Sequence, residues 1–160
     1  MKKKLPIIAI IAALAVCIFI VTSEFGDKKE KAKQYESLAA SVSDEALPEA
    51  MGKTYEFIQT NPESGLAVIY TFEISETDDG TRIGRIIADS SAESYEIICA
   101  VLREEDAEVF IFGRYAEGEL SGADFSAGDV LARLHFKDGR VIPEWVGLRD
   151  VTSGDVVANF

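Results

Sequence analysis

The fold is decided by the stretch LAVIYTFEIS, residues 66–75, in which the side chains alternate between two classes. The even-numbered residues are all large and apolar, whereas the odd-numbered ones include a threonine, a glutamate and a serine. Successive side chains of an extended strand point to opposite faces, so this period of two predicts a strand with one buried face.

Similar stretches lie on both sides of this strand and are separated by short polar turns. Asp138-Gly139 is the strongest hairpin signal, and Val156-Val157 could add a short last strand. We expect further strands at 55–59, 83–89, 95–102, 108–116, 130–137 and 140–148. Consecutive strands of this kind predict an all-β meander of seven or eight antiparallel strands, either a closed barrel or a sandwich. Closure would remove exposed strand edges, which favours the small barrel.

The amino terminus has the pattern of an export signal. Three lysines at positions 2–4 precede an uncharged apolar run, residues 5–21. As a helix this run spans about 25 Å, at the short limit for a bilayer core of ~30 Å. We expect residues 1–23 to be an uncleaved signal anchor that crosses the membrane through residues 5–21. The alternatives are a signal peptide cleaved after Ser23 and lipidation of Cys17.

A tail of only four residues before the apolar run is typical of a signal anchor. We therefore expect the carboxyl-terminal domain to lie outside the cytoplasmic membrane, or to be secreted if the leader is cleaved. Residues 24–53 are rich in Lys, Glu, Ala and Ser, and Tyr35, Leu38, Ala39 and Val42 recur at helical spacing. This segment is predicted to be a polar helical linker, either a solvated stalk or a partner-binding helix, ahead of a β-barrel domain at 54–160.

Composition excludes several classes of function. The net charge of −12 repels phosphate backbones, so a nucleic-acid partner is not expected. A single histidine (His135) and two cysteines (Cys17 and Cys99) cannot form a zinc cluster or a disulfide framework, and no cofactor is predicted. Cys99 lies on an apolar strand and is expected to be a small core residue.

No motif of a known catalytic class is present. The chain has no nucleophile elbow, P-loop, dinucleotide fingerprint or HExxH pattern. His135 is expected to be an ordinary exposed or hydrogen-bonded histidine, and the carboxylate clusters at 78–79, 104–106 and 117–119 fall at predicted turns. We therefore predict that the protein is not an enzyme.

Three arginines, Arg85, Arg114 and Arg133, fall in mid-strand within this acidic domain. They are expected to point outward and to pair across strands with Glu73 or Glu96. An arginine that pointed into the barrel instead would need a partner and could bind an anionic ligand.

The carboxyl-terminal part resembles a family of small bacterial exported or membrane-anchored proteins. The resemblance is carried by FSAGDVL, residues 125–131, followed by Leu134, Gly139, Trp145 and Leu148. In that family an F-x-x-G-D-x-L strand start precedes a hairpin and a strand that bears a tryptophan. The resemblance implies a leader, a short linker and a lipocalin- or avidin-like β-barrel without an established activity. Many members look like lipoproteins, and the poor cleavage box before Cys17 departs from that pattern.

Two functions are compatible with these observations. The first is a non-enzymatic binding module that holds a small apolar or amphipathic molecule in the barrel or serves as an envelope scaffold. Its candidate ligand residues are Tyr70, Phe72, Ile97, Phe112, Arg114 and Trp145. The second is an acidic envelope protein that binds or inhibits a basic protein such as lysozyme. Its candidate loop is 117–129, with Glu117, Glu119, Asp124 and Phe125.

Overall fold

The computed structural model describes residues 27–42, 52–91, 94–118 and 124–148. The chain divides into two compact units, Met1–Gln34 and Tyr35–Phe160. Of the first unit only residues 27–34 are described, and they form an exposed helical segment. The predicted leader (1–23), the last short strand (156–157) and Glu119 lie outside the described residues. Within the ranges given above, no helix combines the length and the apolarity needed to cross a bilayer.

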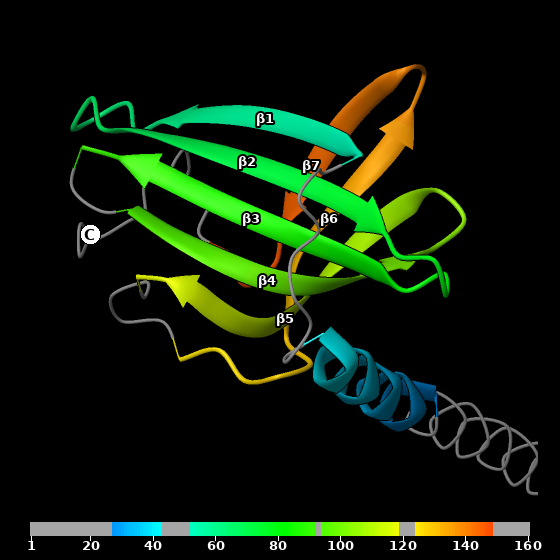
Figure 1. Ribbon diagram of the computed structural model, residues 1–160. Coiled ribbons are helices and arrows are strands. Elements are labelled where there is room, and N and C mark those ends of the chain that lie inside the picture. Colours follow the sequence, from blue (N-terminus) through cyan, green and yellow to red (C-terminus); the bar gives the residue numbers. More distant parts are fainter. Residues whose placement is uncertain (1–26, 43–51, 92–93, 119–123, 149–160) are drawn as a thin grey trace, which may run out of the picture. The chain divides into compact units, whose positions relative to one another are not determined.

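The second unit is built on one antiparallel sheet of seven strands (Figure 1). The strands are β1 (Lys53–Thr60), β2 (Ala67–Glu76), β3 (Arg82–Ser90), β4 (Ser94–Arg103), β5 (Ala107–Glu117), β6 (Val130–Lys137) and β7 (Arg140–Trp145). Each strand pairs with the next along the chain, so the order in the sheet is the order in the sequence. The prediction of an all-β antiparallel meander is confirmed.

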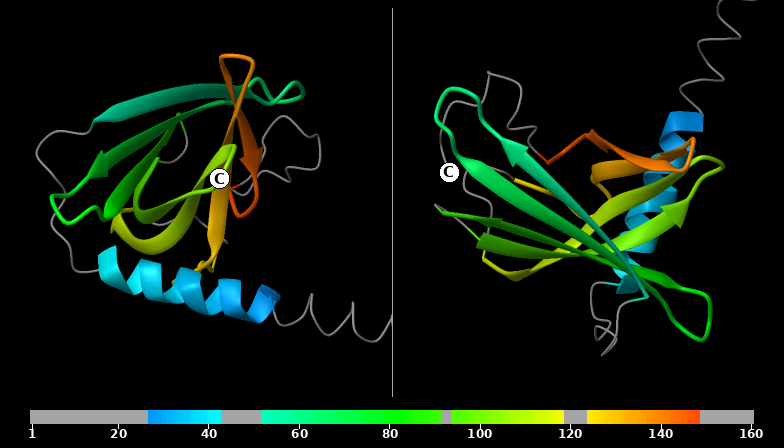
Figure 2. Two further views of the ribbon diagram at one scale, coloured as in Figure 1. Left: turned by 90° about the vertical axis from the view of Figure 1, so that its right-hand side faces the viewer. Right: turned by 90° about the horizontal axis from the view of Figure 1, so that it is seen from above.

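The sheet curls from β1 round to β7 into a half-barrel (Figure 2). In the described part of the chain no backbone ladder joins β1 to β7, so these two strands are the edges of the sheet. The register shifts at Ile98/Cys99 and at Phe110/Ile111 mark irregularities in β4–β5 and β5–β6. Such bulges increase local twist and bend a strand, which helps the sheet to curl.

The inner face of the half-barrel carries the main core. Its members come from every strand from β2 to β6 and include Tyr70, Phe72, Ile97 and Phe110, none of which is exposed to solvent. Gly84 on β3 is part of this packing, because a Cβ atom there would lie 2.6 Å from Cγ2 of Val101. The alternation of residues 66–75 thus places the even-numbered side chains on the inner face, as predicted.

A second cluster covers part of the outer face. Tyr35, Ala39 and Val42, from the end of the helix over residues 27–42, pack with Ile98 and Ile111 of β4 and β5. Gly128 (φ 100°) allows the chain before β6 to approach this helix, since a Cβ atom there would lie 3.0 Å from Cγ of Glu36. Residues 35–42 therefore belong to the folded unit and bury apolar surface of the sheet.

Two turns fix the register of neighbouring strands. Asp138 and Gly139 both have positive φ (52° and 72°), the conformation that a tight two-residue hairpin requires between β6 and β7. At the β2–β3 turn, Asp79 accepts hydrogen bonds from the hydroxyl of Thr77 and from the backbone N–H of Thr81. The hydrogen bond from Thr77 is the main reason why the pKa of Asp79 lies below its ordinary value.

Candidate ligand site

The structure brings together five of the six residues predicted to line the barrel. Tyr70, Phe72 and Ile97 are fully buried in the inner core, Phe112 is 6% exposed, and Trp145 is half-buried against them. The ring of Trp145 lies 4.9 Å from that of Tyr70 and 5.9 Å from that of Phe72.

The sixth residue, Arg114, lies elsewhere. It pairs in register with Ile98, a member of the outer cluster, so it shares the outer face and not the aromatic core.

Two surface hollows are lined by described residues, and both lie away from the aromatic rings of Tyr70, Phe72 and Trp145. One, of about 520 Å³, is formed by the β2 and β3 ends around Ile69 and Asp89. The other, of about 280 Å³, lies between Ile87, Tyr95 and Glu117. The five inner residues named above thus act as packing partners of one another in this structure.

The predicted partner loop is described only in part. Glu117 and Asp124 are exposed, but Phe125 packs back on the inner core, with its ring 5.5 Å from that of Phe112. Asp129 accepts a hydrogen bond from the backbone N–H of Ser126 at 2.8 Å, so the Gly128-Asp129 pair shapes the entry to β6.

The predictions for single residues on the outer face are confirmed for Arg85 and His135. Arg85 points outward and forms ion pairs with Glu73 and Glu96, its neighbours across β2 and β4. His135 is partly exposed and its Nε2 lies 2.9 Å from Oε2 of Glu144.

Arg133 also lies on the outer face, but its partners are Glu104 and Glu144, not the glutamates that the sequence suggested. Cys99 is fully buried, and burial raises the pKa of its thiol far above the usual range.

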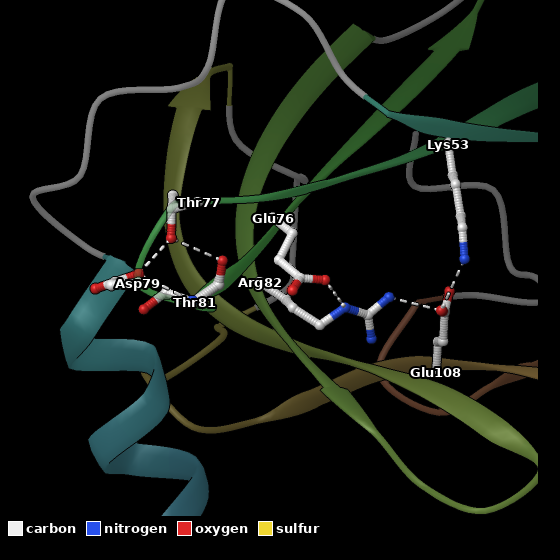
Figure 3. A network of polar contacts seen from close by, with 7 residues as sticks. All are labelled: Lys53, Glu76, Thr77, Asp79, Thr81, Arg82 and Glu108. Carbon is white, nitrogen blue, oxygen red and sulfur yellow. Dashed lines mark hydrogen bonds and ion pairs between the residues drawn. The ribbon is translucent and has the colours of Figure 1, made fainter.

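The inner face holds a polar group that sequence reasoning missed. Glu108, the second residue of β5, is only 2% exposed, and its Oε1 lies 2.6 Å from Nη2 of Arg82 on β3 (Figure 3). Lys53 on β1 lies 4.0 Å from the same oxygen, and Arg103 on β4 is the register partner of Glu108. We call Lys53, Tyr55, Arg82, Arg103 and Glu108 the mouth cluster, because they gather where β1, β3, β4 and β5 reach one end of the half-barrel.

Local structure explains why the mouth cluster forms. Alternation along β5 puts Glu108 on the same face as Phe110, and alternation along β3 puts Arg82 on the same face as Gly84 and Ile86. The hydrogen-bonded Thr77–Thr81 turn ends one residue before Arg82, and Glu76 lies 3.9 Å from Nε of Arg82 on its exposed side. The guanidinium group of Arg82 thus contacts Glu76 on one side and the buried Glu108 on the other.

Two atoms of this ion pair have no hydrogen-bond partner although both are buried. They are Nη1 of Arg82 and Oε2 of Glu108. A buried polar group without a partner costs about 1–3 kcal/mol, and more when it is charged, so natural proteins contain few of them. The pair therefore offers one donor and one acceptor that the described residues do not use.

Aromatic side chains flank this polar pair. Tyr55 on β1 and Phe136 on β6 contact each other edge to face at 5.9 Å, and Phe136 is 41% exposed. The pKa of Tyr55 is raised, first by burial and then by the negative charge of Glu108, so its phenol stays neutral near pH 7. The site thus combines an unsatisfied polar pair with a partly exposed apolar rim.

The alternation of side chains between the two faces of β3 and β5 is the sequence signal from which the buried charges of this site could have been predicted. Sequence reasoning considered arginines in mid-strand, whereas Arg82 and Glu108 stand at strand ends, where charged residues are normally solvated. Counting the period of two back from Ile86 and from Phe110 puts both charges on the buried face.

The described residues include no group of three or more histidine, cysteine, aspartate or glutamate side chains placed to hold a metal ion. The mouth cluster supplies hydrogen bonding, charge and apolar contact. No family model, no curated protein and no solved structure matches this chain.

Proposed function

We propose that the protein is a non-catalytic binding module whose half-barrel takes a small amphipathic ligand at the mouth cluster. We propose further that its leader anchors it in the bacterial cytoplasmic membrane with this domain outside, and that the domain is of the lipocalin or avidin type. The observation that carries the proposal is Glu108, which is 2% exposed while its Oε2 has no hydrogen-bond partner in the described part of the chain.

A binding role explains the free-energy cost of the two buried polar atoms without a partner, which a purely structural role leaves unexplained. An apolar pair of similar volume would fill the positions of Arg82 and Glu108 at least as favourably, because desolvating two charges offsets most of their attraction. A ligand that supplies the missing donor and acceptor recovers this cost on binding.

The place for the apolar part of the ligand is the rim and not the deep interior. Tyr70, Phe72 and Ile97 already fill the inner core, so an apolar group entering there would have to displace Trp145. The exposed ring of Phe136 and the half-buried side chain of Val141, its partner on β7, offer contact without such rearrangement.

Native mass spectrometry of the full chain, purified from bacterial cells in mild detergent, tests this proposal. We expect a non-covalent added mass in the wild type that is lost in E108Q. The matched control is E73Q, which alters the Arg85–Glu73 pair on the outer face. The added mass should remain in E73Q; its absence from the wild type, or its retention in E108Q, would contradict the proposal.

A second candidate is binding of a basic protein, favoured by the exposed carboxylates of the outer face. Glu105 and Asp106 are exposed in the β4–β5 turn. Glu144 on β7, with 52% of its side chain exposed, contacts His135 as Asp106 does. Such a surface attracts a cationic partner at low ionic strength. Retention of lysozyme at low salt and its loss above ~0.5 M salt are expected; no retention at any salt concentration removes this candidate.

A further inference from the structure

The unpartnered atoms of the mouth cluster define the chemistry of a ligand head group. Nη1 of Arg82 can only donate hydrogen bonds, and Oε2 of an ionised Glu108 can only accept them. The other ends of the same two side chains are joined at 2.6 Å, so the free atoms belong to one fixed pair. A ligand group that satisfies both must accept a hydrogen bond at one atom and donate one at another.

Carboxylate and ammonium head groups fail this requirement. A carboxylate accepts from Arg82 but has no proton to give to Glu108, and it brings a second negative charge beside the first. An ammonium group donates to Glu108 but cannot accept from Arg82, and it meets the positive charges of Arg82, Lys53 and Arg103. In either case one buried atom stays unpaired.

An amide meets the requirement without adding charge. We propose that the mouth cluster binds ligands through a neutral amide group, whose carbonyl oxygen accepts from Nη1 of Arg82 while its N–H donates to Oε2 of Glu108. This inference rests on the proposed binding function and specifies the class of ligand. The apolar remainder of the ligand lies against Phe136.

Entry to the site passes Lys53 and Tyr55. The side chain of Lys53 is 55% exposed and its Nζ lies 4.0 Å from Oε1 of Glu108, a loose contact that a flexible side chain can give up. β1, which carries both residues, is an edge strand in the described sheet and is bonded only to β2. Edge position and loose contact make this the side from which a ligand reaches Glu108.

Three small molecules with the same chain and different head groups test the inference: butanamide, butanoate and butylammonium. The readout is the NMR shift of the Leu134 methyl groups in the full chain, since Leu134 is the register partner of Glu108 on β6. We expect butanamide to cause a saturable shift with a dissociation constant at least about tenfold below those of the two charged compounds.

The double variant R82M/E108L should abolish the butanamide shift, whereas the matched outer-face variant R85M/E73L should keep it. Both double variants remove one ion pair between two strands of the sheet, and neither removes one partner alone, which keeps them folded. A shift that persists in R82M/E108L overturns the placement of the amide.

The remaining outcomes separate this inference from the proposed function. Equal or tighter binding of butanoate or butylammonium overturns the amide class and leaves a binding module with a charged ligand. If none of the three compounds shifts the Leu134 methyl signals, the inference is overturned. An ordered water is then the partner of both atoms. The added mass in native mass spectrometry then tests the proposed binding function independently of the amide inference.

Discussion

The ring of Trp145 on β7 lies 6.1 Å from the ring of Phe57 on β1, at an interplanar angle of 89°. These two strands are the edges of the described sheet and share no backbone ladder there. The edge-to-face contact therefore links the two ends of the half-barrel through side chains. Trp145, the only tryptophan of the chain, thereby covers the inner core between these two edge strands.

Replacing Trp145 by alanine should destabilise the domain by about 3 kcal/mol, the low end of the range for a buried aromatic residue. The ring also contacts Tyr70 and Phe72, and all three contacts are lost together. Urea unfolding followed by circular dichroism measures the change. The control is I142A on the same strand, where the side chain is 48% exposed and a change below about 0.5 kcal/mol is expected. Equal effects of the two variants would show that Trp145 does not link the edges.

The Arg82–Glu108 pair should show strong coupling in a double-mutant cycle. R82M leaves the carboxylate of Glu108 buried with only the loose contact to Lys53 as an ion pair among the described residues, and a loss of about 3 kcal/mol is expected. R82M/E108L should return to within about 1 kcal/mol of the wild type, because no uncompensated charge remains.

The outer-face variant R85M provides the comparison. Its partner Glu73 is less buried than Glu108, so a loss of about 1 kcal/mol or less is expected. Urea unfolding of the wild type, R82M, E108L and R82M/E108L gives the cycle, and R85M is measured beside them. A loss for R82M no larger than that for R85M would mean that Glu108 reaches water in solution.

Stability should fall at high pH in a way that depends on Tyr55. Its pKa is raised above 10.0 by burial and by Glu108, so the folded state holds the phenol proton more tightly than the unfolded chain does. The resulting stability is complete below pH 10 and is lost as the pH rises through the raised pKa. The urea midpoint of Y55F should therefore fall less between pH 9 and pH 11 than that of the wild type. An identical fall of the urea midpoint in both proteins would mean that the phenol of Tyr55 is solvated and does not sense the charge of Glu108.

Cys99 should be inert in the folded protein. Burial raises the pKa of its thiol, so almost no thiolate is present at pH 8, and the side chain has no exposed surface. In a C17S variant, which leaves Cys99 as the only thiol, reaction with a disulfide reagent should be slower than in the unfolded chain by about a hundredfold or more. Rapid reaction without denaturant would mean that the inner core opens readily.

The strand pattern was predictable because it rests on local information. The period of two at 66–75 and the Asp138-Gly139 turn depend only on neighbouring residues, and the structure has the seven strands in the predicted order. That β1 and β7 share no backbone ladder in the described sheet was not predictable, since pairing of these strands depends on contacts between residues that lie far apart in the sequence. Arg85 was placed correctly because its partners, Glu73 and Glu96, sit on adjacent strands.

The contact between Arg82 and Glu108 in the mouth cluster could not be predicted from the sequence, because it forms only when the sheet curls. Arg82 and Glu108 are 26 residues apart and lie on strands that are separated by β4, so a flat sheet would keep them about two strand spacings from each other. Curling the sheet turns their side chains toward a common centre. Alternation alone gives the face on which each residue lies, and only the three-dimensional arrangement joins the two charges.

A crystal structure of the full chain grown with butanamide tests the binding role of the mouth cluster most directly. It should show the amide within about 2.9 Å of both Nη1 of Arg82 and Oε2 of Glu108, with the alkyl chain against Phe136. Density for water alone at these two atoms, or an amide bound elsewhere on the half-barrel, would contradict it.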